Sequence, residues 1–240
     1  MSAVLYSVAD GVATLTLNRP ESRNALNLEM CKGIIEAART AVSDDSIKLF
    51  FVKANGTVFC AGADLKERQG MSEAQVRERR MKGFAAYAAL EALPMPAIAV
   101  VQGPAVGSGC EIAGACDFIV ATPEASFRTP EAIRGTVGAT QRLPRILGKR
   151  LAKDLMFTGR ELSAEEAREA GLVSRLVGAS EIERVLQEIK TEILRAPQQS
   201  LRLAKRCIDR GVELDPKGAL EAEIAAIEEQ LAAGTWMGKK

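Results

Sequence analysis

The feature that most constrains the fold is an alternation of short apolar runs with helical patterns along the first half of the chain. Residues 49–52 and 97–101 are continuous apolar runs, which are typical of strands covered on both faces. A third strand is expected over residues 117–121. Helical spacing begins after Asn27 and again after Ser72, so strands and helices follow one another in turn. This order predicts an α/β architecture with largely parallel strands.

Several local signals mark where these elements begin. Residues 1–18 predict a β-hairpin that turns at Asp10-Gly11. Asn27 is the expected N-cap of the first helix, and residues 72–75 and 163–166 have the form of capping boxes. The buried face of the first helix is expected to carry Leu28, Cys31, Ile35, Ala38 and Val42.

The character of the chain changes from about residue 139, where helical patterns take over. Only residues 172–177 still predict a strand, and apolar residues at helical spacing continue to about residue 233. We therefore expect a core over residues 1–178 and a C-terminal helical region over residues 179–240. That helical region would pack on the core or on a neighbouring subunit.

The sequence contains no histidine among its 240 residues. This excludes Ser-His-Asp and Cys-His nucleophile systems, and it removes the commonest zinc ligand. Acid–base chemistry near neutral pH would therefore fall to Asp, Glu, Lys, Tyr or Cys side chains.

The charge balance is close to neutral, with 32 Lys and Arg against 31 Asp and Glu. Neither this charge balance nor an aromatic content of 4% indicates binding to nucleic acid or to a membrane surface. No apolar segment reaches the roughly 18 residues that a membrane span needs, and the N-terminus has no secretory signal pattern. The five cysteines are odd in number and lack zinc or redox spacing, so we expect reduced thiols in a cytoplasmic protein.

Two glycine- and alanine-rich stretches could bring a ligand close to the main chain. The first, residues 59–66, follows a predicted strand, and its small residues would leave backbone N–H groups accessible. Taken alone, it is equally a tight strand-to-helix connection. The second, residues 103–117, is a glycine-rich turn that enters a short helix over residues 111–115, whose free amides favour an anion.

Two glutamates are candidates for acid–base work. Glu111 lies in the first turn of that short helix among residues typical of interiors, where burial tends to raise a carboxyl pKa. It could instead only complement the helix dipole. Glu131 follows Pro130, which fixes the backbone just before it. On its own, Glu131 could be an ordinary first-turn glutamate.

Taken together, the motifs resemble the crotonase superfamily, most closely its enoyl-CoA hydratase branch. They occur in family order and spacing over about residues 1–210. The segment 59–68 particularly resembles the methylglutaconyl-CoA hydratase group. The matching segments are Leu17-Asn-Arg-Pro20, Asn24-Ala-Leu26, Phe59-Cys-Ala-Gly-Ala-Asp64, Gly107-Ser-Gly-Cys-Glu111, Pro130-Glu131, Thr140-Gln-Arg-Leu143 and Ala170-Gly-Leu-Val173.

The resemblance implies a crotonase-like spiral of ββα units with a helical C-terminal region that forms trimers, often paired into hexamers. It implies an acyl-CoA thioester substrate, with coenzyme A present only as part of that substrate and with no redox cofactor or metal. In such enzymes the N–H groups of Ala63 and Ser108 would form an oxyanion hole for the thioester carbonyl. Glu111 would activate the water, and Glu131 would exchange a proton with the α-carbon.

The resemblance also implies where coenzyme A would lie. Ala61 would be near the adenine, with Ala25 in the same binding segment. Arg23 and Lys66 would lie near the phosphates. Pocket walls are expected from residues 66–90 and from the helical tail.

The chain departs from the family pattern in three places. Ser108 stands where the family usually has glycine. The turn between Glu131 and Thr140 is about three residues shorter than usual, which could re-aim Glu131 or open the pocket. The C-terminal segment 234–240 lacks the family's usual aromatic and basic residues, which help to close the coenzyme A site.

Three functions remain open at this stage. The leading hypothesis is a 2-enoyl-CoA hydratase that uses both glutamates. An enoyl-CoA isomerase or another crotonase-type reaction would need only one acid–base group and the oxyanion hole. A non-catalytic relative that binds coenzyme A or RNA is the third, although the near-neutral charge and rare aromatics argue against RNA.

Overall fold

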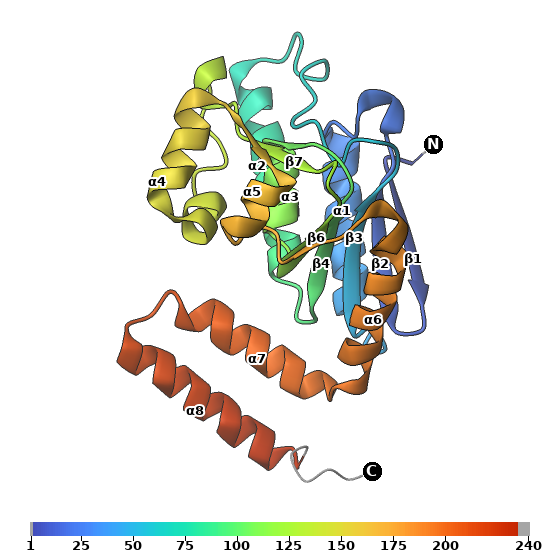
Figure 1. Ribbon diagram of the computed structural model, residues 1–240, viewed down its shortest axis with the longest axis vertical. Coiled ribbons are helices and arrows are strands. Elements are labelled where there is room, and N and C mark those ends of the chain that lie inside the picture. Colours follow the sequence, from blue (N-terminus) through green and yellow to red (C-terminus); the bar gives the residue numbers. More distant parts are fainter. Residues whose placement is uncertain (1, 235–240) are drawn as a thin grey trace.

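The computed structural model describes residues 2–234 and consists of a six-stranded sheet with helices on both faces, a small second sheet and a helical tail (Figure 1). The strand order in the large sheet is β1-β2-β3-β4-β6-β9. Its strands are β1 (Val4–Ala9), β2 (Val12–Leu17), β3 (Leu49–Ala54), β4 (Ala97–Val101), β6 (Phe118–Ala121) and β9 (Arg175–Leu176). The small sheet, in the order β5-β7-β8, contains β5 (Ala105–Val106), β7 (Ser126–Arg128) and β8 (Glu161–Ser163).

Strand pairing confirms the predicted α/β class. β1 and β2 form the expected antiparallel hairpin, and every other pair in the large sheet is parallel. The helices are α1 (Leu28–Val42), α2 (Glu73–Glu91), α3 (Ser108–Gly114), α4 (Arg142–Thr158), α5 (Ala164–Glu169), α6 (Ile182–Arg195), α7 (Gln198–Gly211) and α8 (Pro216–Ala232). In residues 2–234, three short 3₁₀ turns each lie between a strand and the next helix: η1 (Pro20–Ser22), η2 (Ala132–Arg134) and η3 (Ala179–Glu181).

The large sheet is apolar on both faces, as the continuous apolar runs predict. Because side chains alternate along a strand, Phe50 and Val52 of β3 enter the main core with α1 and α2. Leu49 and Phe51 point to the opposite face, where α6 covers them. The sheet is therefore a buried central layer, and burying both of its faces supplies the main driving force for folding.

The first helix begins where the sequence predicts, but its buried face differs from the expected one. The Asn27 side chain accepts a hydrogen bond from the Met30 N–H (2.9 Å), a cap that stabilises a helix by about 1 kcal/mol. Val42, which was expected on the buried face, is 50% exposed, and Ile35 is only partly buried. The buried residues are Met30, Cys31, Ile34, Ala37, Ala38 and Ala41. Cys31 and Ala38 are buried as predicted. Apolar residues occupy several adjacent faces of this helix, so spacing alone identifies the buried face only in part.

The predicted strand over residues 172–177 is confirmed only at Arg175–Leu176. The reason lies at the end of α5, where the N–H groups of Leu172 and Val173 both donate to the carbonyl of Ala167. These two amides terminate the helix, so the first bond to the neighbouring strand is made by the Ser174 N–H, which donates to the Ile119 carbonyl (3.0 Å). Leu172 and Val173 are still buried in the core, which explains why they have the apolar character of a strand. The capping boxes at Ser72 and Ser163 are both present.

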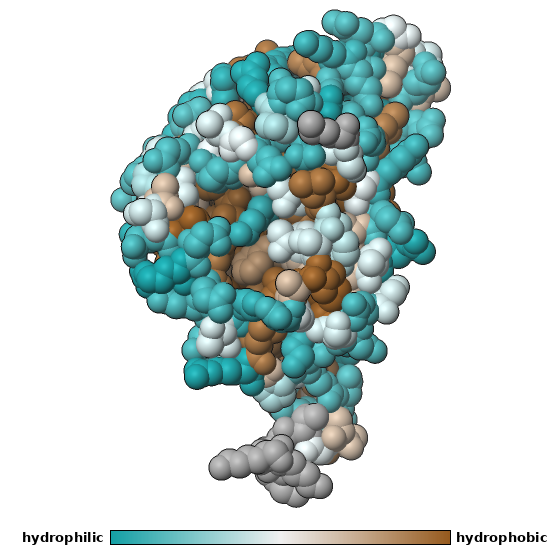
Figure 2. All heavy atoms as spheres, turned by 90° about the vertical axis from the view of Figure 1, so that its right-hand side faces the viewer, coloured by the Kyte–Doolittle hydropathy of each residue, from teal (hydrophilic) through white to brown (hydrophobic). Residues whose placement is uncertain are grey.

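The C-terminal helices divide into one that packs on the core and two that leave it. α6 covers the sheet, whereas α7 and α8 extend away and contact each other (Figure 1). Within α7 and α8 only Leu203 and Ala226 are buried. Large apolar side chains remain exposed on this pair: Ile208, Val212, Leu220, Ile224, Ile227 and Leu231. On the face that Figure 2 shows, hydrophilic side chains cover most of the surface, with apolar patches between them.

All five cysteines lie in the described part of the chain as free thiols, as expected. Cys31, Cys60, Cys110 and Cys116 are buried, and only Cys207 on α7 is partly exposed. Burial raises the pKa of Cys31 to about 11 and that of Cys60 to about 12. These thiols behave as small apolar groups of the core.

Across residues 2–234, no helix combines the length and apolar character required to span a lipid bilayer.

Candidate active site

A small pocket lies where α2, the N-terminus of α3 and the segment after β7 meet. Its volume is about 90 Å³. Both candidate glutamates line it, together with both candidate oxyanion residues. The complete lining is Leu26, Ala63, Arg68, Arg79, Arg80, Gly83, Phe84, Tyr87, Ser108, Glu111, Glu131, Thr136, Val137, Gly138 and Ala139.

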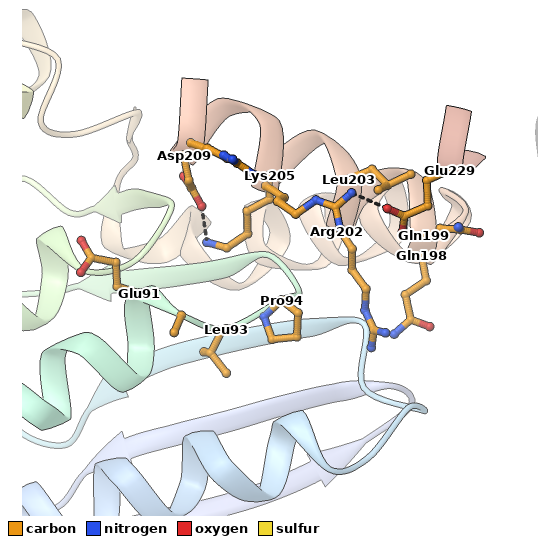
Figure 3. Close-up of a pocket in the computed structure, with 13 residues that line it drawn as sticks. Glu91, Leu93, Pro94, Gln198, Gln199, Arg202, Leu203, Lys205, Asp209 and Glu229 are labelled. Carbon is orange, nitrogen blue, oxygen red and sulfur yellow. Dashed lines mark hydrogen bonds and ion pairs between the residues drawn. The ribbon is translucent and has the colours of Figure 1, made fainter. Parts of the chain in front are cut away.

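A much larger hollow, of about 900 Å³, lies elsewhere, between the segment Glu91–Pro94 and α7 (Figure 3). It contains no candidate catalytic residue. Two ion pairs, Arg206 with Glu229 and Lys205 with Asp209, join residues of its lining. Size therefore does not identify the site, and we take the small pocket with its two carboxyl groups as the candidate.

The backbone around Ala63 is held by pairing with the segment before α1. The Leu26 N–H donates to the Gly62 carbonyl (2.8 Å), and the Asp64 N–H donates to the Leu26 carbonyl (2.9 Å). This bridge engages the residues on either side of Ala63 and leaves the Ala63 N–H itself without an acceptor in residues 2–234. The Asp64 carboxylate forms an ion pair with Arg19 (2.9 Å). Its Oδ1 also accepts hydrogen bonds from the N–H groups of Lys66 (3.0 Å) and Glu67 (3.2 Å), which fixes the following turn.

The second free amide belongs to Ser108, the first residue of α3. An N–H in the first turn of a helix has no intrahelical acceptor, and within the described chain Ser108 N–H has no other one. Gly107, just before it, has φ 51° and ψ −104°, a conformation that side chains avoid. The pocket thus presents two unused backbone donors, on Ala63 and Ser108.

Glu111 is buried, and only one of its two carboxyl oxygens has a hydrogen-bond partner in the described chain. Its Oε2 accepts a hydrogen bond from Nη1 of Arg142 (2.7 Å), while its Oε1 is buried without a partner in the described chain. Burial raises the pKa of Glu111, and the Arg142 guanidinium partly offsets this rise. Nη2 of Arg142 donates to Oε2 of Glu91 (2.6 Å), so this arginine joins two carboxylates.

Glu131 faces the same pocket from η2. Its Oε2 is buried with no partner, and none of the ion pairs found in residues 2–234 involves it. Burial raises the pKa of Glu131, and the nearby charge of Glu111 raises it further. Two glycines leave room for this carboxyl: a Cβ on Gly107 would lie 2.4 Å from Oε1 of Glu131, and a Cβ on Gly138 would lie 3.1 Å from its Cγ.

The short segment after Glu131 curls back over the carboxyl. The N–H groups of Arg134 and Thr136 both donate to the Glu131 carbonyl, and Gly135 takes a left-handed conformation with φ 71°. The guanidinium of Arg80 on α2 donates to the Val137 carbonyl across the pocket. The shortened turn therefore places residues 136–139 in the pocket wall and leaves Glu131 directed inward.

The residues expected to hold coenzyme A lie outside the pocket lining, and two of them, Ala61 and Lys66, are close to Ala63 along the chain. Ala61 N–H donates to the carbonyl of Arg23 (3.0 Å), which brings the segments of Ala61, Arg23 and Ala25 together. The Arg23 and Lys66 side chains are exposed. The expected wall from residues 66–90 is present through residues 68–87, whereas no residue of α6, α7 or α8 lines the pocket. Of the C-terminal segment 234–240, which lacks the family's usual aromatic and basic residues, residues 235–240 lie outside the described residues.

Sequence reasoning missed two members of the site. The sequence gives no role to Arg142, which lies in the matching segment 140–143, or to Arg80, which lies in the expected pocket wall over residues 66–90. Their partners Glu111 and Val137 are 31 and 57 residues away in the sequence. No local spacing carries that information. Within the described chain, no group of three or more Cys, Asp or Glu side chains is arranged to hold a metal ion.

The fold and the pocket define an α/β protein with a carboxyl pair beside two free amides. Comparison with known sequences then identifies the family, because the sequence model described as Enoyl-CoA hydratase/isomerase matches residues 7–234. The chain belongs to the enoyl-CoA hydratase/isomerase family.

Individual relatives agree with this assignment. The chain is 37% identical over 234 residues to the putative enoyl-CoA hydratase/isomerase YngF of Bacillus subtilis, covering 95% of this chain and 90% of the relative. It is 41% identical over 224 residues to the mitochondrial enoyl-CoA hydratase domain-containing protein 2 of Mus musculus, covering 89% and 75%. The crystal structure of an enoyl-CoA hydratase from Bacillus anthracis superimposes with a TM-score of 0.91 at 35% identity, covering 94% of this chain and 90% of that one. The crotonase fold expected from the sequence is therefore confirmed.

Proposed function

We propose that this protein is an enoyl-CoA hydratase, a lyase that adds water across the 2,3 double bond of an enoyl-CoA thioester. The observation that carries the proposal is the meeting of two carboxyl groups, the buried Glu111 and the half-buried Glu131, in one pocket with two unused backbone donors. Each glutamate keeps one oxygen without a partner in the described chain, so a water molecule could accept or donate a hydrogen bond at both.

In the proposed reaction, Glu111 acts as the general base. It takes a proton from water while the water oxygen bonds to C3, and the π electrons of the 2,3 double bond move onto the thioester oxygen. Glu131 then donates a proton to C2 as the enolate collapses. A proton returned from Glu111 to Glu131 restores the starting state, so the sum is one water added.

The backbone donors would stabilise the negative charge that develops on the thioester oxygen. We assign this role to the N–H groups of Ala63 and Ser108. Preorganised donors of this kind are worth about 3 kcal/mol each in the transition state. The side chain of Ser108 does not remove its N–H, so a serine at this position is compatible with the role.

The coenzyme A portion of the substrate would extend from Ala63 along the outer surface. We assign its adenine to the neighbourhood of Ala61 and Ala25, and its phosphates to Arg23 and Lys66. The exposure of both cations supports this assignment, since an exposed side chain can reach a bound phosphate. No other cofactor is required by the proposed chemistry.

An enoyl-CoA isomerase is the second candidate, and one observation favours it. Glu131 has no ion-pair partner in the described chain and could move a proton between C2 and C4 by itself. Names of the relatives include both activities, as in the isomerase/hydratase fer4 of Mycosarcoma maydis.

The test is the loss of conjugated thioester absorbance with crotonyl-CoA, for wild type, Glu111→Gln and Glu131→Gln. We expect activity in wild type and a fall of roughly a hundredfold or more in both variants, because each carboxyl carries one proton transfer. Glu124→Gln, a change at an exposed glutamate, is the matched control and should leave the rate unchanged.

Two outcomes would contradict the proposal. A wild type inert on crotonyl-CoA and on longer and branched 2-enoyl-CoAs rejects hydration. Conversion of 3-enoyl-CoA to 2-enoyl-CoA that survives Glu111→Gln but not Glu131→Gln establishes the isomerase instead.

We further propose that the protein forms a homotrimer or a hexamer. Support comes from the exposed apolar side chains of α7 and α8, since large apolar patches usually mark contact surfaces. Light scattering of wild type should give three or six chains per particle, and Ile224→Asp together with Ile227→Asp should lower that number. A monodisperse monomer would reject this proposal.

A further inference from the structure

We propose that Arg142 is a positioning residue that holds the Glu111 carboxylate in place and makes Glu111, rather than Glu131, the general base. Glu91 holds Arg142 in turn. The kinetic part of this inference rests on the proposed hydratase function, whereas its electrostatic part does not.

The Arg142 guanidinium is held from two sides. Nη1 contacts Glu111 on α3 at 2.7 Å, and Nη2 contacts Glu91 at the end of α2 at 2.6 Å. Its Cζ lies 5.9 Å from the centre of the Tyr87 ring, also on α2. Arg142 itself is the first residue of α4 and lies outside the pocket lining, so one side chain connects three helices behind Glu111.

The ion pair with Glu111 is shielded, whereas the one with Glu91 is not. The exposed fractions of the side chains are 17% for Arg142 and 8% for Glu111, but 55% for Glu91. A charge–charge contact is stronger where water is excluded. Arg142 therefore interacts more strongly with Glu111, and Glu91 mainly fixes the direction of the guanidinium.

No equivalent contact supports Glu131. The charged and titratable groups that face the two carboxyls come from α2 and the segment before it, α3, α4 and η2. They are Arg79, Arg80, Tyr87 and Glu91 on α2, Arg68 just before it, Cys110 on α3, Arg142 on α4 and Arg134 on η2. Arg79 is paired with Glu67. Of the cations in this set, only Arg142 forms a hydrogen-bonded ion pair with either pocket carboxyl.

This asymmetry sets the order in which the pair loses protons. Two carboxyls that share one pocket repel each other when both are charged, so their titrations are coupled. The first proton leaves from the carboxyl whose charge is better compensated, which is Glu111 beside Arg142. Glu131 keeps its proton over the same pH interval. Hydration needs this state: one carboxylate to take a proton from water and one carboxylic acid to give a proton to C2.

The kinetic test compares Arg142→Gln, Arg142→Lys and Glu91→Gln across pH. In Arg142→Gln the acidic limb of the kcat/KM profile should move to higher pH by about one unit, because the positive charge that favours the Glu111 carboxylate is lost. At neutral pH, kcat should fall roughly tenfold with little change in KM, since Arg142 does not contact substrate. Arg142→Lys keeps the charge, so its acidic limb should stay near that of wild type. Glu91→Gln should have the smallest effect.

A neighbouring arginine supplies the matched control. Arg145 lies on the same helix and pairs with the exposed Glu213 at 3.1 Å, away from the pocket carboxyls. Arg145→Gln should leave the profile unchanged. Thermal melting of every variant checks that the fold is retained. If Arg142→Gln does not fold, Arg142→Lys is used instead to test whether the shape of the arginine side chain matters.

A second readout is independent of turnover. The carboxyl ¹³C resonance of Glu111, identified by its absence in Glu111→Gln, should titrate at higher pH in Arg142→Gln than in wild type. If that midpoint does not move, Arg142 does not control Glu111 and the proposal is wrong, whether or not the enzyme is active. If the midpoint moves but wild type hydrates no enoyl-CoA, the electrostatic inference holds and the hydratase assignment fails. If the midpoint moves in an active enzyme whose pH profile does not, Glu111 is not the base.

Discussion

The two walls of the pocket hold their carboxyl groups by opposite means. Glu111 lies on a helix and is tied by an ion pair of 2.7 Å to Arg142. Glu131 lies in a short loop, and its side chain packs against Gly107 and Gly138. Because these two residues have no Cβ, the carboxyl fits closely against them, and this close packing fixes its position. An ion pair therefore compensates the charge of Glu111, whereas only close packing holds Glu131.

The difference shows how a single pocket can give two chemically identical groups different properties. Both carboxyls are largely buried, and burial alone would raise the pKa of each. Only the wall of Glu111 opposes this effect with a cation in direct contact. The wall of Glu131 contributes close packing, which is sensitive to single methyl groups.

The largest effect is expected from adding a methyl group to the Glu131 wall by Gly107→Ala. The new Cβ would meet Oε1 of Glu131 at 2.4 Å, and the backbone at φ 51° and ψ −104° excludes side chains. We expect a loss of about 3 kcal/mol in the free energy of unfolding and a roughly hundredfold fall in hydratase rate. Denaturant titration and the crotonyl-CoA assay measure the two quantities.

Gly135→Ala is the matched control for this substitution. Gly135 also has a positive φ, of 71°, but no atom lies within 4 Å of its ideal Cβ. Only the backbone cost of about 1 kcal/mol should remain, without loss of rate. If both variants behave alike, the close packing around Glu131 is not what fixes its position.

An intermediate effect is expected on the pH dependence of stability. A carboxyl whose folded pKa is raised above its ordinary value of about 4.5 binds more protons in the folded state than in the unfolded one. The free energy of unfolding should therefore fall as pH rises from about 4.5 through the raised pKa. Glu131→Gln should remove part of this fall and increase stability at pH 8 by about 1 kcal/mol. Melting temperatures between pH 4 and 8 provide the measurement.

Glu111→Gln sharpens the same comparison. Its gain at pH 8 should be smaller than that of Glu131→Gln, because Arg142 already compensates part of the burial cost of Glu111. An equal or larger gain for Glu111→Gln would mean that the ion pair does not distinguish the two walls.

The smallest effect is expected from Gly138→Ala. Its Cβ would lie 3.1 Å from Cγ of Glu131, a contact that a shift of a few tenths of an ångström relieves. We expect a change of less than about 1 kcal/mol in stability and a few-fold fall in rate. On α3, outside the pocket lining, a Cβ on Gly114 would make ordinary contacts with Ile146 (3.7 Å) and with Cβ of Arg142 (3.9 Å). Gly114→Ala should therefore keep full activity, and a larger loss there than at Gly138 would contradict the comparison.

Much of the fold follows from local pattern. The apolar runs that became β3 and β4 and the cap at Asn27 are short-range signals, and each appears where the sequence predicts. The errors arise where one segment satisfies two patterns. Leu172 and Val173 are apolar enough for a strand, yet their amides cap α5 instead.

The candidate site likewise contains residues that local motifs could predict and residues that they could not. The two glutamates and the segments of Ala63 and Ser108 could be picked out because each sits in a recognisable local motif, and the structure places all four around one pocket. The groups that control them could not be predicted. Arg142 meets Glu91 from 51 residues away, and such pairs depend on how whole helices pack.

The distribution of thiols has a practical consequence for studying this molecule. Four of the five cysteines are enclosed by the core, and burial holds their thiols in the unreactive protonated form. Cys207 alone is partly accessible, and it lies on α7, the helix that leaves the core. A maleimide dye would therefore attach selectively at Cys207, without any engineered cysteine. Its fluorescence would report on the surroundings of the tail while the pocket stays chemically untouched.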